Sequence, residues 1–227
     1  MNATTRKKLT DRRLTTPHSA AISGVISGIL FIIIEVIQIA FSQYPTGNPA
    51  FWEENLDVLI LTVNLVPFAG IFFLWFIGVN RDRLGDLEDK FFATIFLGSG
   101  LLYLATTFIA NAMSFGMIST YGQDSTFSTS QVYSFTRTAV YQITYVYASR
   151  MSAVFMISSA TMWMSTRVMP IWLAILTYLL AFVLLLVVSI NPWLVLVFPV
   201  WMVVVSIFIL IANYRCQSVD QAALSGA

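Results

Sequence analysis

The stretch that decides the fold is residues 170–213, PIWLAILTYLLAFVLLLVVSINPWLVLVFPVWMVVVSIFILIAN, which contains no charged side chain. It consists of two apolar runs of about 20 residues each, the length that a helix needs to cross a bilayer core of about 30 Å. The runs are separated only by Asn191-Pro192, a dipeptide typical of turns. The stretch therefore predicts an antiparallel pair of transmembrane helices, whose apolar surface favours contact with lipid or with a partner subunit.

Four further apolar runs of similar length precede this pair. None shows the alternation over about ten residues that marks the strands of a membrane barrel, so we predict an all-α, polytopic bundle of six transmembrane helices. The composition agrees, because 58% of the 227 residues are hydrophobic and 10% are charged, against roughly 25% charged in soluble domains. This excludes a soluble enzyme and a nucleic-acid binder with a basic face. The predicted spans are residues 20–41, 57–79, 91–114, 141–165, 170–190 and 193–213, with a basic tail at 1–19 and a second tail at 214–227.

Basic residues near the ends of the spans predict the orientation, because cytoplasmic loops carry an excess of Lys and Arg. Ten basic residues fall on the side that holds both tails, whereas Arg137 is alone on the other side. We therefore expect both termini in the cytoplasm. The ten residues are Arg6, Lys7, Lys8, Arg12, Arg13, Arg81, Arg83, Lys90, Arg167 and Arg215.

The segments on the outer side are predicted to be short. Asn48-Pro49 has the residue types of a helix N-cap and a first helical position, which predicts a small helix there. Residues 115–131 are rich in Ser, Thr and Gly, so we expect a loop. Residues 132–140 are expected to extend the fourth helix outward or to lie at the membrane interface.

Residue counts exclude several kinds of site. Cys216 is the only cysteine and His18 the only histidine, so neither a cysteine-based metal centre nor a haem held by two histidines forms within one chain. The two residues lie in opposite tails, which leaves no candidate for Ser-His-Asp or Cys-His catalysis. We therefore expect no enzyme activity, no cofactor and no metal.

Two charged residues lie deep within the predicted spans, where inserting a charge costs about 2.5–3.5 kcal/mol. Glu35 lies 15 residues after Ala20 in a span that runs outward, and Arg150 lies 9 residues after Tyr141 in a span that runs inward. At about 1.5 Å per residue, the two levels differ by less than the reach of the side chains. We therefore expect a Glu35–Arg150 ion pair.

More polar side chains are predicted at the same level of the bundle. Gln38 lies three residues after Glu35 on the same helix face, and Asn64 and Asn111 lie in the second and third spans. The predicted intramembrane polar cluster therefore consists of Glu35, Arg150, Gln38, Asn64 and Asn111. It either fixes the packing of the helices or forms a ligand or ion site, and the sequence leaves both open.

Gly24 and Gly28 form a Gly-x-x-x-Gly pattern in the first span, which lets two helices approach closely. They begin a stripe that continues through Phe31, Glu35 and Gln38 in steps of three and four residues, the spacing of one helix face. We expect this face to look toward the interior and the glycines to pack helices within the bundle, in preference to a dimer seam.

Three segments of the chain carry a resemblance: FIGVNRDRLGD at 76–86, KFFATIFLGSGLL at 90–102, and YASRMSAVFMIS at 147–158, which contains Arg150. They resemble a group of uncharacterised bacterial membrane proteins with six helices. The resemblance implies localisation in the bacterial cytoplasmic (inner) membrane. It carries no known activity, so no site residues follow from it.

Three classes of function fit these observations. The first expectation is a structural or accessory subunit of a membrane assembly, because catalytic residues are lacking and residues 170–213 offer an apolar surface. A small transporter or channel would use the Glu35–Arg150 level, and a binding protein for a lipid or other apolar ligand would use the bundle interior. The expected partners are the lipid bilayer and, through residues 170–213, other membrane subunits, with no nucleic acid.

Overall fold

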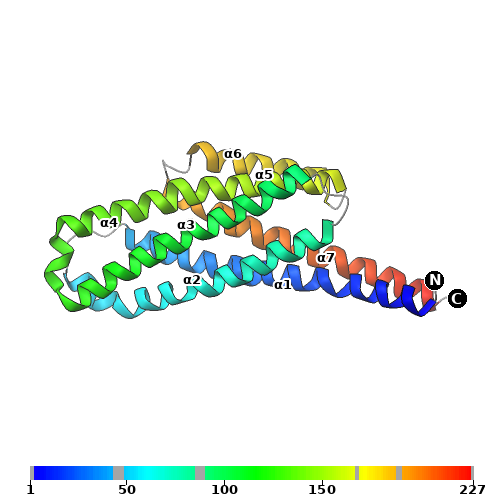
Figure 1. The fold of residues 1–227 in the computed structure, drawn as a ribbon, viewed down its shortest axis with the longest axis horizontal. Coiled ribbons are helices and arrows are strands. Elements are labelled where there is room, and N and C mark those ends of the chain that lie inside the picture. The colour runs from blue at the N-terminus through cyan, green and yellow to red at the C-terminus, as the bar shows by residue number, and fades with distance from the viewer. Residues whose placement is uncertain (1–2, 43–48, 85–89, 167–168, 188–190, 226–227) are drawn as a thin grey trace.

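The computed structural model describes residues 3–42, 49–84, 90–166, 169–187 and 191–225, and every element in these ranges is helical (Figure 1). The all-α prediction is therefore confirmed for the described residues. The α-helices are α1 (Ala3–Ser42), α2 (Pro49–Leu84), α3 (Lys90–Gln123), α4 (Gln131–Gln142), α5 (Ser149–Thr166), α6 (Ile171–Val187) and α7 (Val197–Ser225). The shorter segments are the 3₁₀ helices η2 (Ser125–Thr129) and η4 (Pro192–Leu196) and the π-helix η3 (Ile143–Ala148).

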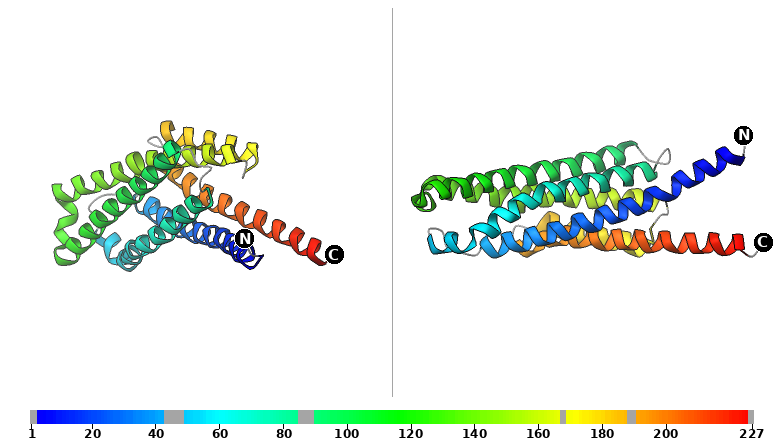
Figure 2. Two further views of the ribbon diagram at one scale, coloured as in Figure 1. Left: turned by 45° about the vertical axis from the view of Figure 1, so that its right-hand side comes forward. Right: turned by 90° about the horizontal axis from the view of Figure 1, so that it is seen from below.

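Successive passes of the chain run in opposite directions along one bundle (Figures 1 and 2). The passes are α1, α2, α3, the continuous segment α4–η3–α5, α6, and η4–α7. Helix α1 packs against α2 and α7, α3 packs against α2 and α5, and α5 packs against α6. Helix α1 begins and α7 ends at one end of the bundle, which we call the termini end. The turn from α3 to α4 lies at the opposite end, which we call the η2 end.

Among the described residues, four helices are long and apolar enough to cross a membrane: Ala21–Phe41, Glu54–Arg81, Phe91–Gln123 and Pro192–Ala212. They correspond to the first, second, third and sixth predicted spans. The predicted fifth span contains a shorter apolar helix, Ile171–Leu186. The predicted fourth span is divided by the π-helix η3. The chain is thus an all-helical protein with several helices suited to a membrane.

Helix α6 presents an apolar face on the outside of the bundle. Large apolar side chains on its outer face are 60–68% exposed, among them Ile171, Trp172, Leu179, Phe182 and Leu186. A soluble monomer rarely exposes such a continuous apolar surface, whereas lipid tails are as apolar as these side chains. The face therefore suits a helix in contact with hydrocarbon.

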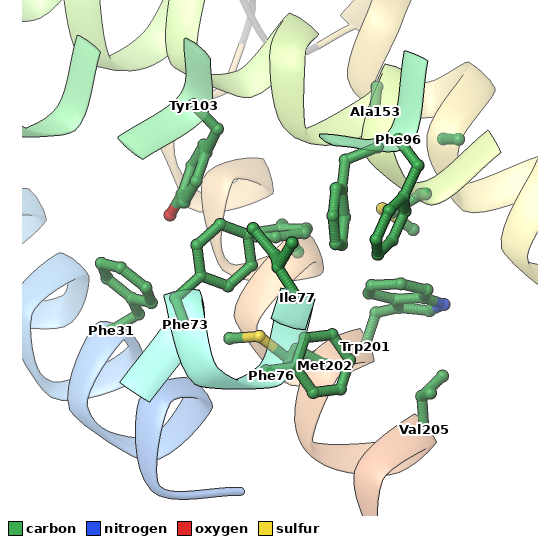
Figure 3. Packing of buried hydrophobic residues seen from close by; sticks show 14 of the residues in the cluster. Phe31, Phe73, Phe76, Ile77, Phe96, Tyr103, Ala153, Trp201, Met202 and Val205 are labelled. Carbon is green, nitrogen blue, oxygen red and sulfur yellow. The ribbon is translucent and has the colours of Figure 1, made fainter. Parts of the chain in front are cut away.

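The interior is filled by aromatic rings from several helices (Figure 3). Phe73 of α2 is fully buried, and its ring centroid lies 5.3–6.3 Å from those of four rings on α1, α3, α5 and α7. Such distances are typical of edge-to-face and tilted aromatic contacts. The four rings belong to Phe31, Tyr103, Phe155 and Phe198. This aromatic layer joins the helices near the middle of the bundle.

The structure differs from the sequence-based boundaries at the η2 end. The expected loop at 115–131 is mostly helical, because α3 continues to Gln123 and is followed directly by η2. Hydroxyls in this part of α3 donate to carbonyls of their own helix, as Thr120 does to Gly116 at 2.8 Å, so polar residues do not end it. Likewise Pro49 does not begin a separate small helix but begins α2. Residues 132–140 do form helix, within α4.

Candidate functional site

A cavity of about 580 Å³ lies toward the η2 end of the bundle. Its walls come from the last turns of α1, the first half of α2, the last part of α3, and from α4, η3 and η4. Cavities of about 300–1,000 Å³ with a mainly apolar lining and a few polar groups are typical of small-molecule sites. This cavity is therefore the candidate site.

One face of α4 and η3 supplies the polar wall of the cavity. Tyr133, Arg137, Tyr141 and Tyr145 follow one another at intervals of four residues, and all four line the cavity. This spacing places side chains on one side of a helix. Tyr133 and Tyr145 are buried, whereas Arg137 and Tyr141 are partly exposed. The wall therefore presents one arginine with tyrosines on both sides of it along the helix.

The π-helix η3 lies at the inner end of this wall. The hydroxyl of Ser149 donates to the carbonyl of Thr144, five residues earlier, at 3.2 Å, which matches the wider turn of a π-helix. Both Thr144 and Tyr145 of η3 line the cavity. Single π-turns inside α-helices are frequent at functional sites, and no residue type in this segment predicts one.

The walls that α2 and α3 contribute are apolar in effect. Thr62 donates its hydroxyl to the carbonyl of Val58 at 2.7 Å, and Ser114 donates to the carbonyl of Ala110 at 2.9 Å. Because these hydroxyls are satisfied within their own helices, a ligand meets mainly hydrocarbon there. The neighbouring lining residues are Leu59, Val63, Met117 and Ile118.

Two ionisable groups near the η2 end have shifted pKa values. Burial raises the pKa of the Tyr133 hydroxyl, and the positive charge of Arg137 offsets part of that shift. The exposed Asp124 caps η2: its Oδ1 accepts from the Thr126 hydroxyl at 2.6 Å and from the Thr126 backbone N–H at 2.9 Å. These two bonds lower the pKa of the Asp124 carboxyl. Tyr133 thus remains a hydrogen-bond donor, and Asp124 an anion, at neutral pH.

The expected ion pair between Glu35 and Arg150 is replaced by other contacts. Glu35 is only 5% exposed, and its Oε2 has no hydrogen-bond partner among the described residues. It lies close enough to Tyr103 of α3 for the two groups to interact electrostatically. Arg150 instead donates from Nη1 to the carbonyl of Val146 in its own helix at 3.5 Å. The levels of two residues along a bundle do not fix the direction in which each points around its helix axis, and the π-turn before Arg150 alters that direction.

The other members of the predicted cluster lie in three different environments. Gln38 lines the cavity. Asn111 is partly buried and donates to the carbonyl of Val63 in α2 at 3.1 Å. Asn64 is exposed and donates to the carbonyl of Ile60 in its own helix at 2.8 Å. The five residues therefore do not form one cluster, and only Gln38 belongs to the cavity wall.

Gly24 and Gly28 lie at the contact between α1 and α7. A Cβ atom at Gly24 would overlap the hydroxyl of Ser206 and the ring of Phe76, and one at Gly28 would overlap Val203. The lack of a side chain at both positions thus lets α1 approach α7 within the same chain.

The sequence-based cluster missed the residues that give the cavity its polar character, above all Arg137 and the tyrosines of α4. The distribution of basic residues places Arg137 on the outer side, and residues 132–140, which include Tyr133, are expected to extend the fourth helix outward or to lie at the membrane interface. The signal that identifies them is the four-residue spacing of 133, 137, 141 and 145 across a predicted helix. Within the described side chains, no group of three or more His, Cys, Asp or Glu residues is placed to hold a metal ion.

No protein-family model, curated protein or solved structure matches this chain. The geometry of the cavity is therefore the basis for inferring a function.

Proposed function

We propose that this protein is a membrane-embedded binding protein for an amphiphilic ligand that occupies the cavity. The observation that carries the proposal is the division of the cavity lining. The α4–η3 wall presents Arg137 and tyrosine side chains, and the α2 and α3 walls present hydrocarbon. A ligand with a polar head and an apolar body complements both walls at once, as ligands of mainly apolar pockets with a few polar groups do.

Binding accounts for the cavity better than conduction does. Between the cavity and the termini end lies the aromatic layer, in which Phe31, Phe73, Phe155 and Phe198 are at most 1% exposed. Protein interiors of this kind are packed as densely as organic crystals, so these four rings obstruct the axis of the bundle at their level. The transporter or channel hypothesis would require this layer to open.

We also propose that the chain crosses a bacterial cytoplasmic membrane six times, with both termini in the cytoplasm. The alternating passes and the start of α1 and end of α7 at one end of the bundle support this arrangement (Figure 1). The excess of Lys and Arg in the tails supports the direction. Cys216, the only cysteine, should react with a membrane-impermeant maleimide in inside-out vesicles and not in intact spheroplasts. Reaction in intact spheroplasts would contradict the proposed orientation.

The binding proposal is tested with two matched variants of α3. Ser114 lines the cavity, whereas Thr120 is exposed and lies outside it, and both hydroxyls bond to their own helix. Ser114→Phe should fill the cavity and Thr120→Phe should not. Mass spectrometry of lipids extracted from the purified proteins should find a bound amphiphile with the wild type and with Thr120→Phe. Most of it should be lost from Ser114→Phe, and equal retention by Ser114→Phe would overturn the proposal.

The accessory-subunit hypothesis stays a prediction. The outer face of α6 would suit a partner helix, but lipid covers such a face equally well. Purification from native membranes in mild detergent separates the two cases, because a subunit would retain a stoichiometric partner. Such a partner would place the binding protein inside a larger assembly.

A further inference from the structure

We propose that Glu35 is a proton-binding site: the bundle holds it as a neutral carboxylic acid, and its proton exchanges with water through the cavity. Three observations support this proposal, namely the burial of Glu35 without a partner, the lack of charge around it, and its position between the cavity and the aromatic layer. None of them depends on the ligand that the cavity binds.

The side chain of Glu35 is buried without a neutralising partner. It is 5% exposed, and its Oε2 accepts no hydrogen bond from the described residues. Arg150 donates instead to the carbonyl of Val146 in its own helix. An ionised carboxylate without a partner is costly to remove from water, whereas the neutral acid avoids most of that cost. Burial of this kind therefore favours a carboxyl group that has bound a proton.

The helices around Glu35 present no charge to it. Helix α1 packs against α2, η4 and α7. The apolar stretches of these elements, residues 58–80 and 192–212, contain no Asp, Glu, Lys, Arg, His, Tyr or Cys. Within α1 itself, Glu35 is the only charged residue of the stretch 19–41. A buried carboxylate would thus have no counter-charge from these elements.

Two tyrosines are the titratable groups that face this part of α1 from the remaining passes. Tyr103 reaches from α3 toward α1, where its ring lies 5.7 Å from that of Phe31 (Figure 3), and its hydroxyl interacts electrostatically with Glu35. On the fourth pass, Tyr145 packs against Ile39, one turn after Glu35. Tyrosine hydroxyls are ordinarily uncharged at neutral pH, so neither group neutralises a carboxylate.

Glu35 lies between the cavity and the aromatic layer. Gln38, about one turn later in α1, lines the cavity, which is open at α4 where the lining residues Ser134 and Thr138 are exposed. Phe31, about one turn earlier, is fully buried within the aromatic layer (Figure 3). The rings of that layer obstruct the axis toward the termini end, whereas the cavity admits water. The proton of Glu35 therefore exchanges on the cavity side.

Infrared spectroscopy of the full-length protein in lipid tests the proposal, because the C=O stretch of a protonated carboxyl is separate from the bands of carboxylates and of the backbone. Glu35→Gln has nearly the shape of the neutral acid but does not bind a proton, and Glu35→Asp keeps a carboxyl group. Exposed carboxylates such as Asp124 do not contribute to this band at neutral pH. For the route, Ser114→Phe fills the cavity and Thr120→Phe does not.

We expect the wild type at neutral pH to show a protonated carboxyl band that Glu35→Gln loses and Glu35→Asp retains at a shifted frequency. If Glu35→Gln removes no such band, Glu35 is charged and the proposal is overturned. Transfer to D₂O should shift the band more slowly in Ser114→Phe than in the wild type or in Thr120→Phe. Equal rates would overturn the route through the cavity. Both measurements use protein without added amphiphile, so the proposed function is tested separately.

Discussion

The side-chain amide of Asn111 in α3 donates a hydrogen bond to the backbone carbonyl of Val63 in α2, with 3.1 Å between Nδ2 and the carbonyl oxygen. That carbonyl lies four residues before Pro67, which has no N–H to complete the helical hydrogen bond. An unpaired carbonyl is costly where no water is available. The amide of a neighbouring helix therefore supplies the hydrogen bond that the proline removes, and it ties α3 to α2 at that residue.

The first prediction concerns the hydrogen bond from Asn111 to the Val63 carbonyl. Asn111→Leu should lower the free energy of unfolding by about 1–2 kcal/mol, because it leaves the Val63 carbonyl unpaired. Asn64→Leu is the matched control, since Asn64 is exposed and bonds only within its own helix; it should change stability by less than about 0.5 kcal/mol. Denaturant titration of the purified variants, followed by circular dichroism, measures both values.

A second variant distinguishes the loss of the hydrogen bond to the Val63 carbonyl from the loss of packing by the Asn111 side chain. In Pro67→Ala, residue 67 regains an N–H that reaches the Val63 carbonyl within α2. The cost of Asn111→Leu should therefore shrink to below about 0.5 kcal/mol in the Pro67→Ala background, as a double-mutant cycle would show. An unchanged cost would mean that Asn111 stabilises the bundle in another way.

The close approach of α1 and α7 gives the next prediction. Gly24→Ala should destabilise the protein by about 1–3 kcal/mol, because the new methyl group would overlap Ser206 and Phe76 in a packed interior. Gly98→Ala is the control: no atom lies within 4 Å of a Cβ at Gly98, and alanine favours a helix by up to about 1 kcal/mol. Thermal unfolding in detergent should show opposite signs for the two variants. A neutral Gly24→Ala would contradict the tight contact.

Glu35 and Arg150 should behave as independent residues. Arg150 bonds to Val146 of its own helix, and Glu35 lies near Tyr103. Glu35→Met and Arg150→Met should therefore have additive effects on the free energy of unfolding, with a coupling energy within about 0.5 kcal/mol. A coupling energy above about 1 kcal/mol would indicate that Glu35 and Arg150 do form an ion pair. Glu35→Met alone should be neutral or stabilising, because it removes a buried carboxyl oxygen that has no partner in the described part of the chain.

The cap at Asp124 gives a pH-dependent prediction. Hydrogen bonds from Thr126 favour the charged carboxyl and lower its pKa, relative to about 3.9 for an ordinary aspartate. A lowered pKa in the folded state means that the contribution of the cap is present above the unfolded value and is lost as the pH falls through the folded value. Carbon-13 NMR should show Asp124 titrating below pH 3.9, and Thr126→Val should move its midpoint upward. A midpoint at or above 3.9 in the wild type would refute the cap.

The helices of the bundle are largely predictable because lipid imposes a simple rule: each pass needs a long apolar run. Residues 20–41 and 193–213 correspond to apolar helices in the structure for this reason. The boundaries at the η2 end are less predictable, since hydroxyl side chains are typical of loops and yet also bond within a helix. Ser114 and Thr120 do the latter, and α3 therefore extends to Gln123.

The site was harder to predict than the fold. Depth along the bundle follows from counting residues, and on that basis Glu35 and Arg150 belong together. Contact also depends on rotation about each helix axis, which depth does not determine. A charged residue assigned to the outer side, Arg137, proves to line the cavity, because α4 continues the fourth pass beyond its apolar part.

The π-turn η3 sets the helical phase of α4, the part of the fourth pass that lies toward the η2 end. Each residue of an α-helix advances the side-chain direction by about 100°, and a π-turn contains about one residue more than an α-turn. If residues 143–148 formed a plain α-helix at the same chain length, α4 would turn by about 100° relative to α5. Arg137 and the tyrosines of α4 would then leave the cavity wall although the sequence was unchanged. Deleting one residue within η3 would instead remove the extra residue together with the wide turn, and α4 would keep nearly the same direction relative to α5. The polar wall of the cavity thus depends on the conformation of one backbone turn and not on the side chains alone.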